Sequence, residues 1–233
     1  MTPLLLLMGF PPNMAVGTDL LYAALTKGSG VFAHQRKMNI NWKVTGLLAA
    51  GSIPASAITV LFLHTVFTDA GAYESILSSS LGLMLLATSM VILFRKQIQE
   101  KAGSRPGFLL SWIHSRRSGI TVIMGVALGV LVTLSSVGAG AFGAALLVLL
   151  YTKMRPVKIV GTDVAHAVPL TLVAGLGHLW LGNVNFTLLF SLLLGSLPAI
   201  WMGSWLAARL PDRIMRPILG SSLFAMGVKF AFF

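Results

Sequence analysis

The chain has 233 residues, of which 56% are hydrophobic and only 10% are charged, and its mean hydropathy is +0.86. A soluble domain carries about 25% charged residues, so this composition excludes a soluble globular domain and predicts an integral membrane protein. The absence of cysteine excludes disulfides and thiolate metal sites. The formal net charge of +11 does not indicate nucleic-acid binding, because the basic residues fall in short loops between apolar runs.

Apolar runs that come near the length of a membrane span recur along the whole chain. A span needs about 20 mostly apolar residues. Seven stretches qualify: 14–33, 44–64, 75–94, 118–137, 157–177, 186–208 and 215–232. Two shorter runs, 3–10 and 140–151, predict half-helices, re-entrant pieces or short tilted spans. Because lipid cannot hydrogen-bond to exposed backbone, the sequence predicts an all-α, polytopic transmembrane helix bundle.

The basic residues lie in alternate loops. Fifteen of the 17 Lys and Arg residues are in four loops: 34–43, 95–117, 151–158 and 209–216. The loops 64–74 and 178–185 have none. The positive-inside rule therefore places the four basic loops in the cytoplasm. This topology requires 118–137 and 140–151 to enter the membrane and return as a pair.

The chain matches itself at a shift of 144 residues. Residues 12–55 and 156–199 share 14 identities over 44 positions, with Val-Gly-Thr-Asp at 16–19 and again at 160–163. The basic loop 34–43 corresponds to the uncharged loop 178–185, so equivalent loops are predicted on opposite sides of the membrane. The sequence therefore predicts two inverted repeats, an organisation typical of secondary transporters.

The repeats predict three regions: a first repeat at 1–95, a cytoplasmic basic linker at 96–117 and a second repeat at 118–233. The second repeat opens with a Gly-rich apolar hairpin at 125–151, whose counterpart in the first repeat is only the stub 2–10. From this symmetry we expect the first repeat to lack its opening hairpin and the native chain to start upstream of Met1.

Each repeat carries an aspartate inside an apolar stretch. Intramembrane carboxylates are costly and usually face the bundle interior or an aqueous cavity. Asp19 and Asp163 are therefore candidates for a proton carrier or a gate; alternatively, each stabilises the positive end of its helix. The preceding Thr18 and Thr162 are candidates for binding substrate oxygens, or bond back to their own helix backbone.

The small residues at 135–140 predict a turn within the membrane that binds an anion. The candidate residues are Ser135, Ser136, Gly138 and Gly140. The helix that follows would direct its free N–H groups at a ligand, and such groups favour anions. The alternative is close helix packing through small residues.

Two further polar residues share helix faces with the aspartates. Lys27 lies two turns after Asp19, where it would attract an anion, pair with Asp19 or extend to the membrane surface. His166 lies three residues after Asp163, where it would join a proton relay or act as a buried structural group. His178 falls at a span end and is expected to anchor the membrane interface.

Other polar residues indicate no enzyme. No histidine spacing matches a metal motif, and no Ser/His/Asp pairing stands at a useful spacing, so neither a metal nor another cofactor is expected. The asparagines of 39–41 and 183–185 are expected to form turns and caps before the next helices.

Taken together, the motifs resemble the sulfite exporter TauE/SafE family of membrane permeases. They are SSVGAGAFG at 135–143, P-x3-VGTD at 12–19 and 156–163, N-x-N-[WF] at 39–42 and 183–186, and GS-x-PA at 51–55 and 195–199. The resemblance implies a multi-pass protein of the bacterial or archaeal inner (plasma) membrane that acts on sulfite, sulfonates or related organic anions.

The repeat and the resemblance together predict a secondary transporter for a small anion that works by alternating access. Protons are the expected coupling ion if the anion enters the cell. The alternative is a non-transporting membrane scaffold or assembly partner.

Overall fold

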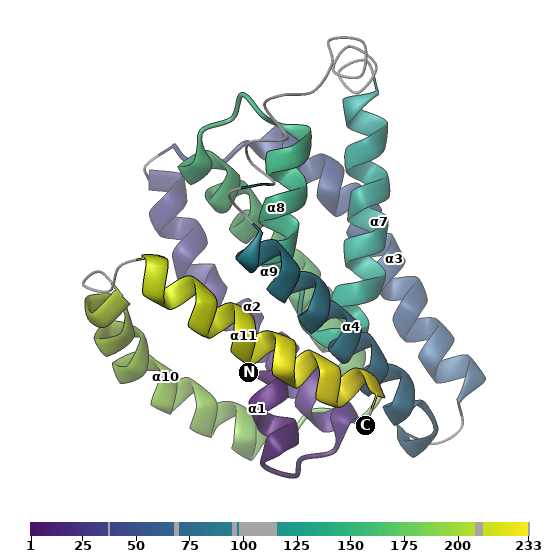
Figure 1. Ribbon diagram of the computed structural model, residues 1–233. Helices are drawn as coiled ribbons and strands as arrows, with labels where there is room; N and C mark the ends of the chain where they lie inside the picture. The colour runs from purple at the N-terminus through teal and green to yellow at the C-terminus, as the bar shows by residue number, and fades with distance from the viewer. Residues whose placement is uncertain (37, 68–69, 95–96, 98–115, 208–211, 233) are drawn as a thin grey trace.

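The computed structural model describes the chain except residues 37, 68–69, 95–96, 98–115, 208–211 and 233. Every regular element in this described part is a helix, which confirms the predicted all-α class (Figure 1). The elements are α1 (Thr2–Leu7), α2 (Pro12–Arg36), α3 (Trp42–Val66), the short 3-10 helix η1 (Ala70–Tyr73), α4 (Glu74–Leu93), α7 (Arg117–Ser135), α8 (Ala141–Leu150), α9 (Pro156–Trp180), α10 (Phe186–Ala207) and α11 (Asp212–Phe232). Most of the predicted linker lies outside the described residues.

Four helical stretches of the described residues are long and apolar enough to cross a membrane: Trp42–Val66, Gly71–Leu93, Arg117–Ser135 and Pro156–Trp180. Three shorter apolar helical stretches accompany them: Ala141–Leu150, Phe186–Ser196 and Pro217–Phe232. The predicted span 14–33 lies in α2, which has 25 residues but is outside the set of four. The predicted short runs 3–10 and 140–151 form the six-residue α1 and the ten-residue α8.

Two asparagines cap the helices that follow the equivalent loops, as the sequence predicts. The Asn41 side chain accepts a hydrogen bond from the Val44 N–H at 3.3 Å at the start of α3. The Asn185 side chain accepts one from the Leu188 N–H at 2.9 Å at the start of α10. Each bond satisfies one of the orphan N–H groups of a first helical turn.

Helices α2 and α9 cross the centre of the bundle in opposite directions and pack closely. Early in α2, Leu21 lies against Gly175, late in α9. Late in α2, Gly30 lies near Val164, early in α9. Glycines let the two backbones approach, as is typical of helix contacts in membranes.

Equivalent glycines of α2 and α9 make equivalent contacts. A Cβ atom on Gly17 would overlap the backbone carbonyl of Asn183. A Cβ atom on Gly161 would overlap the backbone carbonyl of Asn39. The 144-residue shift relates Gly17 to Gly161 and Asn39 to Asn183, and the structure places the loop after α9 on the start of α2 and the loop after α2 on the start of α9.

The small residues of α3 form a second close contact, with α7. A Cβ atom on Gly51 would overlap the Val122 carbonyl, and one on Gly125 would overlap the Leu48 carbonyl. Helices α4 and α11 pack in the same manner, with Gly82 against the backbone of Ala231. The bundle is thus built from pairs of helices that meet through glycine.

Candidate anion and proton site

The turn between α7 and α8 takes a backbone path that needs its small residues. Ser136 has a φ of 55°, Gly138 of 121° and Gly140 of 150°. Glycine adopts such left-handed angles without a steric penalty. The ten residues of α8 correspond to a length of about 15 Å, half of the hydrocarbon thickness of about 30 Å. The turn therefore lies deep relative to the basic loop at the other end of α8.

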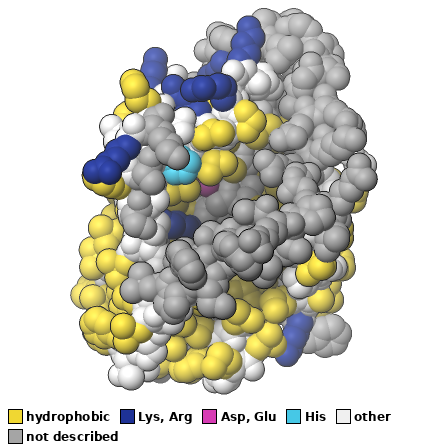
Figure 2. Space-filling model, turned by 90° about the vertical axis from the view of Figure 1, so that its left-hand side faces the viewer, with side chains coloured by type: hydrophobic (Ala, Val, Ile, Leu, Met, Phe, Trp, Pro, Cys, Tyr) yellow, Lys and Arg dark blue, Asp and Glu magenta, His cyan; other side chains and the backbone are white. Residues whose placement is uncertain are grey.

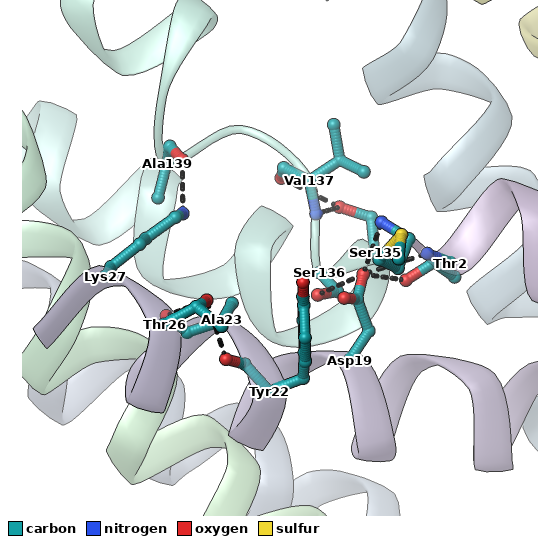
Figure 3. A network of polar contacts seen from close by, with 11 residues as sticks. Thr2, Asp19, Tyr22, Ala23, Thr26, Lys27, Ser135, Ser136, Val137 and Ala139 are labelled. Atoms are coloured by element: carbon teal, nitrogen blue, oxygen red, sulfur yellow. Dashed lines mark hydrogen bonds and ion pairs between the residues drawn. The ribbon is translucent and has the colours of Figure 1, made fainter. Parts of the chain in front are cut away.

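The Asp19 carboxylate is buried and held by several donors (Figure 3). Its Oδ2 accepts from the Thr2 N–H at 2.9 Å, the Thr2 hydroxyl at 2.6 Å and the Ser136 hydroxyl at 3.2 Å. The Met1 ammonium lies 3.2 Å from the same oxygen. Asp19 thus joins α1, α2 and the turn.

Lys27, two helical turns after Asp19 in α2, contacts the same α7–α8 turn. Its Nζ donates to the Ala139 carbonyl at 2.8 Å, and Figure 3 shows it on the α2 face that also carries Asp19. In the described contacts this ammonium bonds to the backbone of the turn and not to the Asp19 carboxylate. Helix α2 therefore presents one negative and one positive group to residues 136–139.

Asp163 approaches the turn from α9 and lies against the start of α8. Only 2% of its surface is exposed, and its buried Oδ1 has no hydrogen-bond partner. A Cβ atom on Gly143, in the first turn of α8, would overlap this oxygen. The N-cap residue Gly140 supplies no side-chain hydrogen bond. An anionic group at this place faces the positive end of a helix dipole.

His166 lies one turn further along α9 and is fully buried. Its Nε2 is 2.8 Å from the Ser52 hydroxyl of α3, while its Nδ1 is buried without a partner. The ring therefore links α9 to α3, and its second nitrogen is a polar group inside the bundle that the described contacts do not satisfy.

Thr18 and Thr162 lie at two equivalent contacts between a helix and a loop, and not at the α7–α8 turn. The Thr18 hydroxyl accepts from the Asn185 N–H at 3.1 Å, and the Thr162 hydroxyl accepts from the Asn41 N–H at 3.0 Å. Thr162 also donates to the carbonyl of Lys158 in its own helix at 2.6 Å. Thr18 thus binds the loop after α9, and Thr162 binds the loop after α2.

Ser135 has a local role at the end of α7. Its hydroxyl lies 2.6 Å from the Leu131 carbonyl and accepts from the Val137 N–H at 3.2 Å. These contacts shape the turn. Of the ten predicted site residues, the structure therefore brings Asp19, Lys27 and Asp163 to the turn that contains Ser135, Ser136, Gly138 and Gly140, and leaves His166, Thr18 and Thr162 at helix contacts beside it.

Comparison with known proteins decides the family. The profile of the sulfite exporter TauE/SafE family matches residues 1–230. The chain belongs to this family. It is 36% identical over 230 residues to the "Probable membrane transporter protein YjnA" of Bacillus subtilis (strain 168), covering 98% of this chain and 89% of that protein. It is 26% identical over 222 residues to the "Probable membrane transporter protein YdhB" of the same organism, covering 95% and 84%. No solved structure matches.

One expectation about this TauE/SafE chain is wrong. His178 does not anchor the membrane interface, because it is fully buried. Its Nε2 lies 2.9 Å from the Thr133 carbonyl of α7, and its Nδ1 lies 3.2 Å from the Asn183 amide. The Asn183 amide also donates to the Tyr73 hydroxyl at 2.6 Å. The end of α9 is covered by α7 and η1, which a span boundary in the sequence does not reveal.

Two partners of the candidate site have no recognisable signal in the sequence. Thr2 holds Asp19, and Ser52 holds His166. Thr2 stands in an apolar run too short for a span, and Ser52 belongs to the GS-x-PA motif, whose pattern indicates the family and the repeat but no partner for a histidine. Among the described residues, no group of three or more His, Asp or Glu side chains is arranged to hold a metal ion.

Proposed function

We propose that this membrane transporter moves a small anion, with sulfite, sulfonates and related organic anions as the substrate class, and that it couples each anion to protons. It works in the inner (plasma) membrane as a multi-pass protein and catalyses no chemical reaction. The description of the family as a sulfite exporter supports an anionic substrate, and the names of the two relatives support transport across a membrane.

The observation that carries the proposal is the meeting of two buried carboxylates and one ammonium at the α7–α8 turn. Asp19 comes from the first predicted repeat and Asp163 from the second, and both are at most 4% exposed. Lys27 supplies a positive charge at the same turn. Ionisable groups inside a membrane protein mark ion or proton pathways by default.

Asp163 links proton binding to anion binding in this proposal. When it is ionised, its carboxylate faces the start of α8 and repels another anion. When it is protonated, the N–H groups at the start of α8 and the Lys27 ammonium are left to bind a substrate anion. A proton and a monovalent anion then bind together, and the net charge of the site stays the same.

The antiparallel contact of α2 and α9 supports alternating access. Equivalent residues of the two helices make equivalent contacts with the loops 39–41 and 183–185. A molecule built of two inverted copies has two conformations of similar energy, each opening to one side. Because the carboxylates of Asp19 and Asp163 are both buried, we assign this structure to a closed state between the two open conformations.

Transport assays in proteoliposomes test the function directly. We expect saturable uptake of sulfite, or of a sulfonate such as sulfoacetate, that an inward proton gradient accelerates. With one proton for each monovalent anion, the flux should not respond to membrane potential, although a bare charge would gain about 2.3 kcal/mol per 100 mV.

The variant Asp163→Asn is expected to lose the response to the proton gradient, because an amide cannot release a proton. Glu74→Gln is the matched control, since Glu74 begins α4 away from the turn. Equal gradient dependence in the wild type and Asp163→Asn would refute the coupling. A folded wild type that moves none of the anions would favour the scaffold alternative.

A further inference from the structure

A basic pocket of about 360 Å³ lies at the end of the bundle that the positive-inside rule assigns to the cytoplasm. Four cationic residues line it: Arg117, Lys153, Arg155 and Lys158. Its other lining residues, Asn41, Tyr151 and Met154, are uncharged. Figure 2 shows Lys and Arg side chains gathered at one end of the molecule, above a broad hydrophobic surface. No carboxylate of the lining offsets these four charges.

Two helices begin at this pocket with uncompensated ends. Arg117 is the first residue of α7, and Arg155 is the N-cap of α9. Neither helix start has a side-chain cap hydrogen bond or an acidic residue in its first turn. Both positive helix ends are therefore left to act on whatever occupies the pocket, and helix N-termini favour anions.

Arg117 is held in place and still has an unused donor. Its guanidinium carbon lies 5.5 Å from the centre of the Tyr151 ring. The Tyr151 hydroxyl is 2.8 Å from the Thr121 hydroxyl, which donates to the Arg117 carbonyl at 2.7 Å. The Arg117 Nε is buried and has no hydrogen-bond partner. A buried unpaired donor is costly, so a ligand that accepts from it gains affinity.

We propose that this pocket binds a phosphate group, either the headgroup of an anionic phospholipid or free phosphate. The planar guanidinium matches two phosphate oxygens at once, and three further cations balance the negative charge. Basic pockets between transmembrane helices on the cytoplasmic side are suited to anionic headgroups. The pocket is separate from the α7–α8 turn, because α8, about 15 Å long, lies between them.

The test measures binding of phosphatidylglycerol, phosphatidylcholine and inorganic phosphate to the full chain by native mass spectrometry and by thermal stabilisation in neutral detergent. We expect phosphatidylglycerol to bind in preference to phosphatidylcholine. Arg117→Gln is expected to weaken this binding about tenfold or more, because it removes charge-assisted hydrogen bonds. Lys153→Gln, at an exposed position, is a second variant that should not disturb folding. It should also weaken the binding of phosphatidylglycerol.

Lys43→Gln is the matched control. Lys43 is exposed in the first turn of α3, on the same predicted side, and does not line the pocket. Binding of phosphatidylglycerol that phosphate does not displace identifies a lipid site, while displacement by millimolar phosphate identifies a site for the free anion. Equal binding of the two lipids with no response to phosphate overturns the proposal. Equal effects of Arg117→Gln and Lys43→Gln overturn it as well.

Discussion

Helices α3 and α10 carry the same motif in different surroundings. Gly51 and Gly195 occupy equivalent places in GS-x-PA. A Cβ atom on Gly51 would overlap the Val122 carbonyl of α7, whereas one on Gly195 would have no atom within 4 Å. Figure 1 shows α7 beside α3, while α10 lies at the opposite edge of the bundle. Gly51 thus forms a packed contact in α3, whereas the equivalent Gly195 faces open space in α10.

A pocket of about 290 Å³ lies beside α10. Leu192, Gly195, Ser196 and Ala199 line it. At the 144-residue shift, these correspond to Leu48, Gly51, Ser52 and Ala55 of α3. In α3 these residues pack against α7 through Gly125 and Gly129. A small-residue motif provides a surface for close approach, but the neighbouring helix decides whether the motif is buried.

The largest expected effect comes from adding a side chain at Gly51, compared with the same change at Gly195. Gly51→Leu should lower the free energy of unfolding by about 3 kcal/mol, because a side chain must push α7 away. Gly195→Leu meets open space, so its effect should stay within about 0.5 kcal/mol. Thermal unfolding of both variants in the same detergent measures the difference. Equal losses in the two variants would show that the packing of α7 does not decide the cost.

A second contrast concerns the two carboxylates. Asp19→Asn should lower the free energy of unfolding by about 2 kcal/mol, because the donors of Thr2 and Ser136 lose a charged acceptor. Asp163→Asn should cost less, since the buried Oδ1 of Asp163 has no partner to lose. Thermal unfolding at one fixed pH measures both. A larger loss for Asp163→Asn would show that Asp163 is the better satisfied group.

The smallest effect should be the same in α2 and α9. Thr18→Val and Thr162→Val each remove one acceptor for a loop N–H, so each should cost about 1 kcal/mol. Unfolding midpoints of the two variants, with Thr65→Val as the exposed control, measure the cost. A clear difference between Thr18→Val and Thr162→Val would show that the two helix–loop contacts are not energetically equivalent.

Local sequence determined much of the secondary structure. The apolar runs predicted the helices, the asparagines at 41 and 185 predicted their caps, and the glycines at 138 and 140 predicted the turn. Each of these features depends on backbone angles, hydrogen bonds or hydropathy within a few residues. The motifs also identified the family, which the match over residues 1–230 confirms. The opposite insertion of the two repeats stays a prediction.

Tertiary structure alone decided which polar groups are satisfied. Asp19 and Asp163 stand in the same four-residue motif, yet only Asp19 meets donors from α1 and the α7–α8 turn. His178 is buried because α7 and η1 cover the end of α9. The physical reason is common to these cases: burial and hydrogen bonding depend on groups brought in from distant parts of the chain, whereas a motif specifies only its own backbone and side chains.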